Sequence, residues 1–250
     1  MNFVSLFSGV GGFDLGLEAA GLTCVAQVEW DKDCQQVLAH HWPHVPRWGD
    51  ITDVHGADLP PADVVAFGSP CQDLSVAGNR TGFVDGGRSN LFHQAIRIVK
   101  EMRHATADQY PTFVVWENVV GALSSNDGRD FAAVLDAMAD CGALDICWRV
   151  LNAQHFGVPQ RRRRIFVVAD LAGERAGQIL AEPPSVRRDT DKGQDQRQSA
   201  ADESGSGTDD DCVTFDLSII GSSSVAATLN SGGNRGGFRT EPGEHLVIIP

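Results

Sequence analysis

Through the first 170 residues, short apolar runs rich in β-branched residues alternate with segments of helical periodicity, and this rhythm limits the possible folds. The strand-like runs occupy residues 3–7, 24–28, 63–67, 112–116, 146–151 and 165–169. The helical segments occupy residues 13–20, 32–41, 90–103 and 129–141. Such alternation is typical of a parallel or mostly parallel sheet with helices on both faces. We therefore expect an α/β fold, and 250 residues suffice for one large domain or one domain plus a partial second.

The formal net charge of −13 argues against indiscriminate binding to polyanions, because phosphate-binding surfaces normally carry a surplus of Lys and Arg. Part of the excess is local: eight acidic residues between 189 and 211 face only Lys192 and Arg197, within a stretch, residues 183–212, where the strand and helix pattern stops and Ser, Gly, Asp and Gln dominate. That composition predicts an acidic flexible linker. Per residue, the segment before the linker is closer to electrical balance than the linker, so a nucleic-acid substrate is not excluded.

Membrane and metal-binding proteins are disfavoured. No stretch approaches the roughly 18 apolar residues that cross a bilayer, and no basic region precedes an apolar one at the N-terminus. We therefore expect a cytoplasmic chain without membrane association. The six cysteines include no Cys-x-x-Cys pair and have no His at zinc-ligand spacing, so we expect no metal site.

Polar and glycine-rich groups follow the expected strands at the points where the strands end. They comprise residues 8–12, 29–30, 49–51, 68–72 and 117–118. Ligands of open α/β sheets bind beyond the carboxyl ends of the strands. The first group suits close backbone approach by a nucleotide-like ligand. It departs from the dinucleotide pattern Gly-x-Gly-x-x-Gly, because Asp14 stands where the third glycine would be and is unwelcome beside a pyrophosphate.

The side chains at the end of the strand-like run 24–28 and at the end of a further short element before residue 51 suit an adenosine. Glu29 can accept hydrogen bonds from both ribose hydroxyls, Trp30 can cover one face of an adenine, and Asp50 can accept from its amino group. Taken singly, each is more often a solvated acid or a buried aromatic residue. Their shared position at strand ends favours a pocket. Carboxylates without a phosphate-binding Lys or Arg suit a cationic nucleoside such as S-adenosylmethionine.

Cys71 stands in a loop whose composition is unlike that of a protein core. An arbitrary cysteine is usually a small buried residue. Here Pro70 and Gln72 flank it, and Gly, Asn, Asp, Ser and Arg recur as far as Arg88. A glycine-rich loop of this length is usually functional or disordered.

Six short motifs occur in a fixed order over about the first 170 residues. They are FSGVGGF (7–13), EWD (29–31), GDI (49–51), PCQ (70–72) with Ser75 and AG (77–78), ENV (117–119) and QRRRR (160–164). In this order they resemble the motifs of DNA cytosine-5 methyltransferases. The glycine loop alone is weakly specific, whereas Pro-Cys-Gln, Glu-Asn-Val and Gln-x-Arg-x-Arg in sequence are highly specific. The resemblance implies a Rossmann-like S-adenosylmethionine-dependent methyltransferase fold.

The resemblance also implies a reaction. A methyl group would pass from S-adenosylmethionine to carbon 5 of cytosine in DNA, in a bacterial or phage restriction-modification setting. Cys71 would add to carbon 6 of a base flipped out of the duplex. Glu117, in its protonated form, would donate to ring nitrogen 3. Arg164 would contact the cytosine carbonyl oxygen, and Arg162 would help to hold the catalytic loop or the thiolate.

Binding roles follow from the same motifs. The expected cofactor-binding residues are Phe7, Gly9, Gly11, Gly12, Glu29, Trp30, Asp50, Ile51, Pro70 and Leu91. The expected DNA-binding residues are Gln72, Ser75, Arg80, Arg88 and Gln160. The loop from Cys71 to Arg88 is the segment expected to close over the flipped base.

The sequence departs from the family after the arginine run. In the family, a target-recognition region and two further motifs follow, but here only Thr228-Leu229 resembles the start of such a region. We therefore expect a catalytic S-adenosylmethionine-binding domain at 1–182, the acidic flexible linker at 183–212 and the start of a partial target-recognition region at 213–250. A truncated form or one subunit of a split enzyme is expected, with a second chain as a possible partner.

Three other interpretations stay open. The tRNA cytosine-5 methyltransferases that resemble the DNA family share its motifs. A non-catalytic fragment that binds cofactor or DNA is compatible with the missing C-terminal motifs. A nicotinamide-dependent oxidoreductase is suggested by the glycine loop and Glu29, although Asp14 and the Pro-Cys-Gln loop disfavour it.

Overall fold

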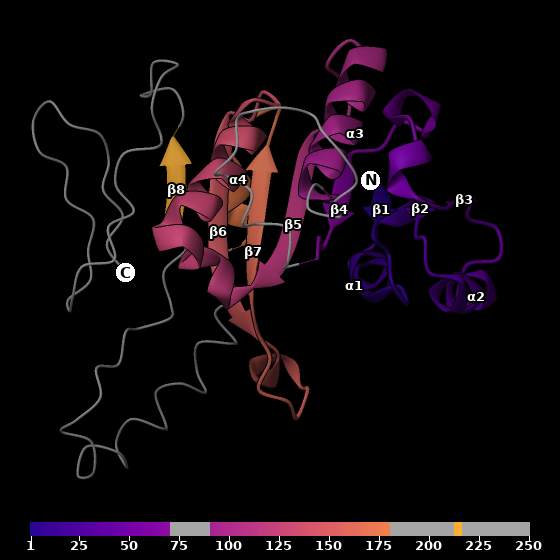
Figure 1. Cartoon of the computed structure of the whole chain (residues 1–250), viewed down its shortest axis with the longest axis horizontal. Coiled ribbons are helices and arrows are strands. Elements are labelled where there is room, and N and C mark those ends of the chain that lie inside the picture. Colours follow the sequence, from indigo (N-terminus) through magenta and orange to yellow (C-terminus); the bar gives the residue numbers. More distant parts are fainter. Residues whose placement is uncertain (71–90, 181–212, 217–250) are drawn as a thin grey trace, which may run out of the picture.

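An eight-stranded sheet organises the described residues of the computed structural model, which are 1–70, 91–180 and 213–216 (Figure 1). The strands are β1 (Asn2–Leu6), β2 (Thr23–Val28), β3 (Arg47–Trp48), β4 (Val64–Phe67), β5 (Phe113–Val119), β6 (Asp145–Asn152), β7 (Arg163–Asp170) and β8 (Val213–Asp216). Their order across the sheet is β3-β2-β1-β4-β5-β7-β6-β8.

The sheet is parallel from β3 to β5 and antiparallel beyond. β7 lies between β5 and β6 and pairs antiparallel with both, and β8 pairs antiparallel with β6. The short connection from β6 to β7 explains the reversal, because neighbouring strands joined by a short loop must run antiparallel. The expectation of a mostly parallel sheet is confirmed.

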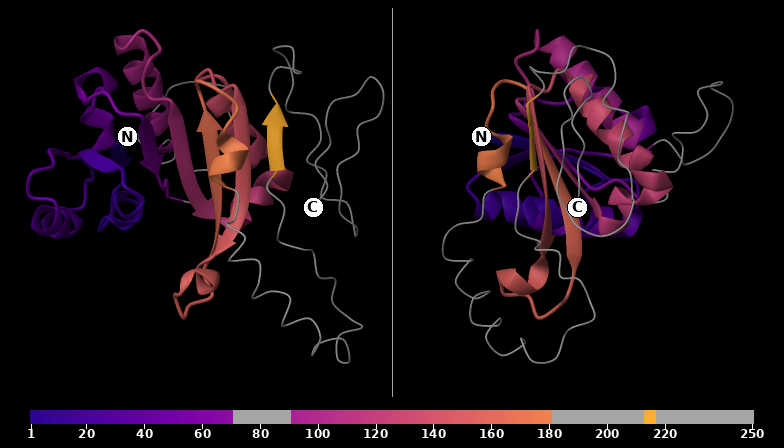
Figure 2. Two further views of the ribbon diagram at one scale, coloured as in Figure 1. Left: turned by 180° about the vertical axis from the view of Figure 1, so that it is seen from behind. Right: turned by 90° about the vertical axis from the view of Figure 1, so that its left-hand side faces the viewer.

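Helices cover both faces of the sheet (Figure 2). They are α1 (Gly12–Ala19), α2 (Lys32–His41), α3 (Leu91–Ala105), α4 (Arg129–Ala139) and α5 (Ala176–Ile179). α1 and α5 contribute to the apolar cluster on one face, and α3 and α4 contribute to the cluster on the other. The first four helices were expected from their periodicity. The short α5 was not, because four residues are too few to show a helical period.

The face under α3 holds the largest part of the core. Phe92 contacts the rings of both Phe67 and Trp116, and Trp116 stacks on Phe131 of α4. β4 is buried along its whole length, as a central parallel strand with helices on both faces must be. This packing holds the ends of β4 and β5 in place, and those ends carry the candidate site.

The order of strands in the sheet reverses at β1, although the strands stay parallel. β2 follows β1 on one side, whereas β4 adds to the other side of β1. In open α/β sheets, a ligand crevice forms outside the carboxyl ends of the strands at such a switch point. We therefore expect the residues just after β1, β2 and β4 to form the ligand site.

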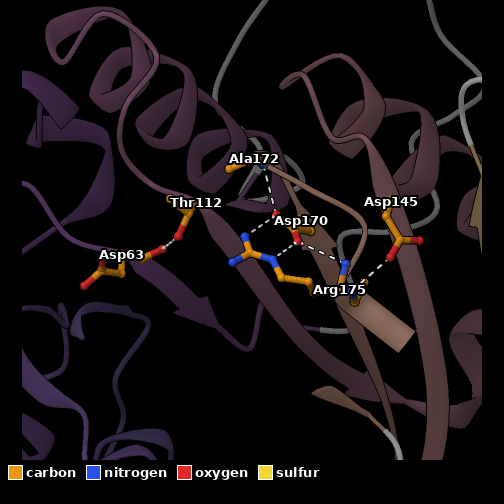
Figure 3. A network of polar contacts seen from close by, with 7 residues as sticks. Asp63, Thr112, Asp145, Asp170, Ala172 and Arg175 are labelled. Carbon is orange, nitrogen blue, oxygen red and sulfur yellow. Dashed lines mark hydrogen bonds and ion pairs between the residues drawn. The ribbon is translucent and has the colours of Figure 1, made fainter. Parts of the chain in front are cut away.

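A polar network closes the opposite edge of the sheet (Figure 3). The fully buried Asp170 receives hydrogen bonds from the Arg175 guanidinium at 2.8 and 3.0 Å and from the backbone N–H groups of Ala172 and Arg175. Burial alone would raise the pKa of Asp170, but these donors outweigh it and hold that pKa below its usual value. Asp145 accepts from the backbone of Ala176 and anchors the start of α5.

Within the described ranges, no helix combines the length and apolarity needed to cross a bilayer.

Candidate active site

A cavity of about 510 Å³ opens at the carboxyl ends of the parallel strands. Its lining comprises Phe7, Val28, Glu29, Trp30, Gly49, Asp50, Ile51, Gly68, Pro70 and Leu91. Seven of the ten residues expected to bind a cofactor are among them, and they come from segments far apart in the sequence. Val28, Gly49 and Gly68 were not among the ten, although Val28 precedes Glu29, Gly49 begins the Gly-Asp-Ile motif and Gly68 begins the polar group at 68–72.

Glu29 is the buried acid of the cavity, with 7% of its surface exposed. Its Oε2 accepts from the backbone N–H of Gly9 at 2.7 Å, and its Oε1 accepts from that of Asp31 at 2.8 Å. These bonds stabilise the charge and orient both oxygens, and a carboxylate oxygen can accept more than one hydrogen bond. Glu29 is therefore preorganised to accept from a ligand as well.

Asp50 and Trp30 stand at the more open side of the cavity. Asp50 Oδ1 accepts from the backbone N–H of Thr52 at 2.9 Å and from its hydroxyl at 2.8 Å. These two hydrogen bonds hold the pKa of Asp50 below its usual value. The Trp30 side chain is 61% exposed beside it. An exposed indole next to a carboxylate can cover a flat polar ring.

The glycine loop after β1 shapes the cavity indirectly. Phe7 and Gly9 have φ values of +53° and +56°, so the backbone turns sharply where β1 ends. Gly11 has φ +89°, and a Cβ there would lie 2.4 Å from the Trp42 ring. Among the described residues, the cavity lining does not include Gly9, Gly11 or Gly12. Gly9 acts through its hydrogen bond to Glu29, and Gly11 lets α1 pack against Trp42.

Asp14 faces the sheet rather than the cavity. It is fully buried and accepts from Ser5 Oγ at 2.9 Å, Gln27 Nε2 at 2.8 Å and Cys24 Sγ at 3.3 Å. The argument that Asp14 would repel a pyrophosphate bound at the loop is therefore wrong. Burial and the neighbouring Asp14 raise the pKa of Cys24 well above its usual value, so this thiol is unreactive.

Glu117 and Arg164 form an ion pair at the border of the cavity. Arg164 Nε lies 3.0 Å from Glu117 Oε1, and each side chain is about one quarter exposed. The pair joins β5 to β7, whose register places Val119 opposite Arg164. A Cβ on Gly68 would lie 3.0 Å from Glu117 Oε2. Gly68 also lines the cavity. The ion pair therefore lies directly behind one residue of the cavity wall.

Buried hydrogen bonds hold the segment that leads from β4 into Pro70. Trp116 Nε1 donates to Ser69 Oγ at 3.0 Å, and Asn118 Nδ2 donates to the Ser69 carbonyl oxygen at 3.2 Å. Sequence reasoning missed these roles of Ser69 and Trp116. A usable signal was that a Trp in a buried strand needs a partner for its N–H group.

The remaining expected site residues divide into two sets. Cys71, Gln72, Ser75, Arg80 and Arg88 lie outside the described residues. Gln160 and Arg162 are exposed in the connection before β7. Of the two motif arginines, Arg164 pairs with Glu117 and Arg162 faces solvent.

The arrangement suits a cationic ligand beside a planar polar one. The described lining of the cavity holds two carboxylates and no Lys, Arg or His. The adjacent ion pair offers a guanidinium donor and a carboxyl group to a flat ring with carbonyl and ring-nitrogen atoms. Within the described part of the chain, no group of three or more His, Cys, Asp or Glu side chains could hold a metal ion.

Comparisons with known proteins agree with this geometry. The model of the family described as C-5 cytosine-specific DNA methylase matches residues 1–214. The Type II methyltransferase M.HhaI of Haemophilus parahaemolyticus is 38% identical over 170 residues, which is 67% of this chain and 48% of that protein. The Type II methyltransferase M.BsuFI of Bacillus subtilis is 37% identical over 168 residues, 67% of this chain and 39% of that protein.

The solved structure of the S. pombe Dnmt2 methyltransferase has the same fold. It aligns with a TM-score of 0.52 at 21% identity, over 70% of this chain and 52% of that one. The chain thus spans about half, or less, of the length of the relatives it matches.

Proposed function

The chain belongs to the C-5 cytosine-specific DNA methylase family, and on that premise we propose that it transfers a methyl group from S-adenosylmethionine to carbon 5 of cytosine in DNA. One observation carries the proposal. An acidic nucleoside-sized cavity lies one residue, Gly68, away from the Glu117–Arg164 pair.

The residues of the cavity fit S-adenosylmethionine. Glu29 would accept from the ribose hydroxyls, since its two oxygens are already oriented by backbone donors. Trp30 would cover the adenine and Asp50 would accept from the adenine amino group. The two carboxylates offset a positive charge in a cavity whose described lining holds no cation. When bound, S-adenosylmethionine supplies an electrophilic methyl group on a sulfonium.

Cys71 is proposed as the nucleophile. It follows Pro70, which lines the cavity. Its thiolate would form a bond to carbon 6 of cytosine, and the displaced electron pair would make carbon 5 nucleophilic. After carbon 5 has gained the methyl group, its proton would leave to solvent and the sulfur–carbon bond would break. The aromatic ring is thereby restored and the thiolate is released.

Glu117 and Arg164 are proposed to hold the cytosine ring. Arg164 would donate to the carbonyl oxygen, and Glu117 would donate to ring nitrogen 3. The ion pair of the structure suits a carboxylate, so this role requires Glu117 to take up a proton when the base enters. The role of Arg162 in holding the catalytic loop stays a prediction.

Trapping with 5-fluorocytosine tests the proposal directly. Fluorine at carbon 5 blocks proton loss, so the bond to sulfur persists and denaturing electrophoresis detects it. We expect a covalent complex that requires S-adenosylmethionine and is lost in Cys71→Ser but kept in Cys34→Ser. The chain is assayed alone and mixed with the C-terminal part of a relative, because it spans about half of such proteins. Absence of the complex in both assays would reject the proposal.

Two narrower parts of the proposal need their own tests. The same trapping experiment on DNA and on tRNA, each containing 5-fluorocytosine, distinguishes the two substrates. A covalent complex with tRNA alone would reject DNA as the substrate. The division into a catalytic domain at 1–182, a linker at 183–212 and a partial recognition region at 213–250 stays a prediction, as does the second chain. Limited proteolysis that cuts first within 183–212 would support the division.

A further inference from the structure

The connection between β6 and β7 projects beyond the carboxyl edge of the sheet (Figures 1 and 2). A single turn of 3-10 helix spans Ala153–Phe156, and Gly157 ends it with φ +80°. The Ala153 N–H donates to the Arg162 carbonyl oxygen at 3.0 Å and closes the base of the loop. The loop, residues 153–162, therefore has a defined shape and stands next to Arg164 of the ion pair.

The charge of this region is opposite to that of the whole chain. Residues 153–162 contain Arg161, Arg162 and His155 and no Asp or Glu, whereas the whole chain carries −13. Arg161 and Arg162 are both exposed on the loop. A concentration of cationic side chains on one projecting element of an acidic protein is an electrostatic footprint for a polyanion.

The tip of the loop is apolar as well as exposed. Phe156 is 50% exposed and Val158 is 45% exposed. A short apolar tip flanked by arginines has the composition of elements that contact phosphates and wedge an apolar side chain against nucleic-acid bases.

We propose that the β6–β7 loop is a DNA-binding element, in which Arg161 contacts a backbone phosphate and Phe156 packs against bases beside the position that the target cytosine leaves. The proposal rests on the proposed function for the choice of DNA as the polyanion. It adds a role for Arg161, which stands at a variable position of the Gln-x-Arg-x-Arg motif, and for Phe156, which precedes that motif, and it gives the loop a mechanical role. Phe156 would lower the cost of unstacking by occupying space that the flipped base vacates.

Equilibrium binding of the full chain to a fluorescent 20-base-pair duplex between 50 and 200 mM NaCl tests the phosphate contact. Arg161→Gln should reduce the slope of log affinity against log salt by about 0.9, the value for one phosphate contact. Lys100→Gln removes an exposed charge from α3 and should leave the slope unchanged. An unchanged slope in Arg161→Gln would overturn the phosphate contact.

The apolar contact has a different signature. Phe156→Ala should weaken binding about five- to tenfold without changing the salt slope, because stacking on a base involves no counterion release. Phe156→Tyr should restore affinity. Leu144→Ala is the matched control, because Leu144 is 51% exposed and precedes β6 at the opposite edge of the sheet. On a duplex with an abasic site, the wild-type chain should bind more tightly and Phe156→Ala should lose that gain.

The outcomes separate this inference from the proposed function. Wild-type binding in both Arg161→Gln and Phe156→Ala, or no duplex binding by the wild-type chain, would overturn the DNA-binding element whatever the trap shows. Loop-dependent binding without a 5-fluorocytosine adduct would support the element and count against methyl transfer. Loss of self-association in Phe156→Ala, with unchanged DNA affinity, would assign the tip to protein contact and overturn the inference. Unaltered S-adenosylmethionine affinity in each variant confirms that its fold is intact.

Discussion

At the scale of single residues, the candidate site depends on acids whose direction is set by their neighbours. Backbone N–H groups orient Glu29, and Arg164 orients Glu117. Gly68 lines the same cavity as Glu29, and a Cβ on it would lie 3.0 Å from Glu117 Oε2. Small changes at these positions should therefore alter function more than stability.

Glu29→Gln should weaken S-adenosylmethionine binding at least about tenfold. The amide removes the negative charge and directs an NH₂ group at one of two backbone N–H donors, which leaves a buried donor unsatisfied. Isothermal titration calorimetry measures the effect. Glu174→Gln, an exposed acid at the opposite edge, is the control. Equal affinities in the two variants would contradict the role of Glu29.

Gly68→Ala should slow adduct formation on 5-fluorocytosine DNA by on the order of tenfold or more. The added methyl group would lie 3.0 Å from Glu117 Oε2 and push that flexible carboxylate out of line with Arg164. The fold should persist, because the carboxylate can move aside. Gly121→Ala has its nearest contact at 4.0 Å and should retain the wild-type rate. A wild-type rate in Gly68→Ala would show that the position of Glu117 does not matter.

At the scale of elements, the two ends of the strands differ in function. The carboxyl ends of the parallel strands present the cavity, whereas the opposite edge is closed by buried polar contacts such as Asp170–Arg175 (Figure 3). The guanidinium also lies 4.6 Å from the centre of the Phe113 ring and so ties α5 to β5. This edge should contribute to stability and not to ligand binding.

Arg175→Gln should lower the free energy of unfolding at pH 7, because it leaves the buried Asp170 without its charged partner. The folded pKa of Asp170 lies below its unfolded value of about 3.9, so this stability is present above pH 4 and is lost as the pH falls through the folded value. Urea unfolding between pH 7 and pH 3 should therefore show a shallower acid dependence in the variant. Arg129→Gln, which breaks an exposed pair with Asp127, should change stability by less than about 0.5 kcal/mol.

At the scale of the whole molecule, the cavity joins the ends of four strands and the start of α3. A ligand that binds there contacts segments spread over residues 7–91 and binds only the folded chain. Binding should therefore stabilise the fold as a unit.

S-adenosylmethionine at about 100 times its dissociation constant should raise the melting temperature by about 5–10 °C. NADH at equal concentration should raise it little, because the described cavity lining offers two carboxylates and no cation to a pyrophosphate. Differential scanning fluorimetry compares the two ligands. A larger shift with NADH would favour the oxidoreductase interpretation.

Much of the fold and part of the site were predictable from local patterns. The four helices and six of the strands follow from hydrophobic periodicity, which neighbouring residues set. Glu29, Trp30 and Asp50 were recognised because strand ends are chemically conspicuous when polar residues follow an apolar run. The need of Trp116 for a hydrogen-bond acceptor was predictable, but the identity of its partner Ser69 was not, since the contacts of Ser69 with Trp116 and Asn118 join positions 47 and 49 residues apart.

The sequence by itself determined the order of six strands and four helices along the chain, the chemical groups at the strand ends and the family. Only the tertiary structure decided that Asp14 faces the sheet, that Arg164 rather than Arg162 pairs with Glu117, and that β7 inserts between β5 and β6. The physical reason is that periodicity is a property of adjacent residues. The side that a residue faces and the partner that it meets depend on strand register, which the packing of the whole sheet sets.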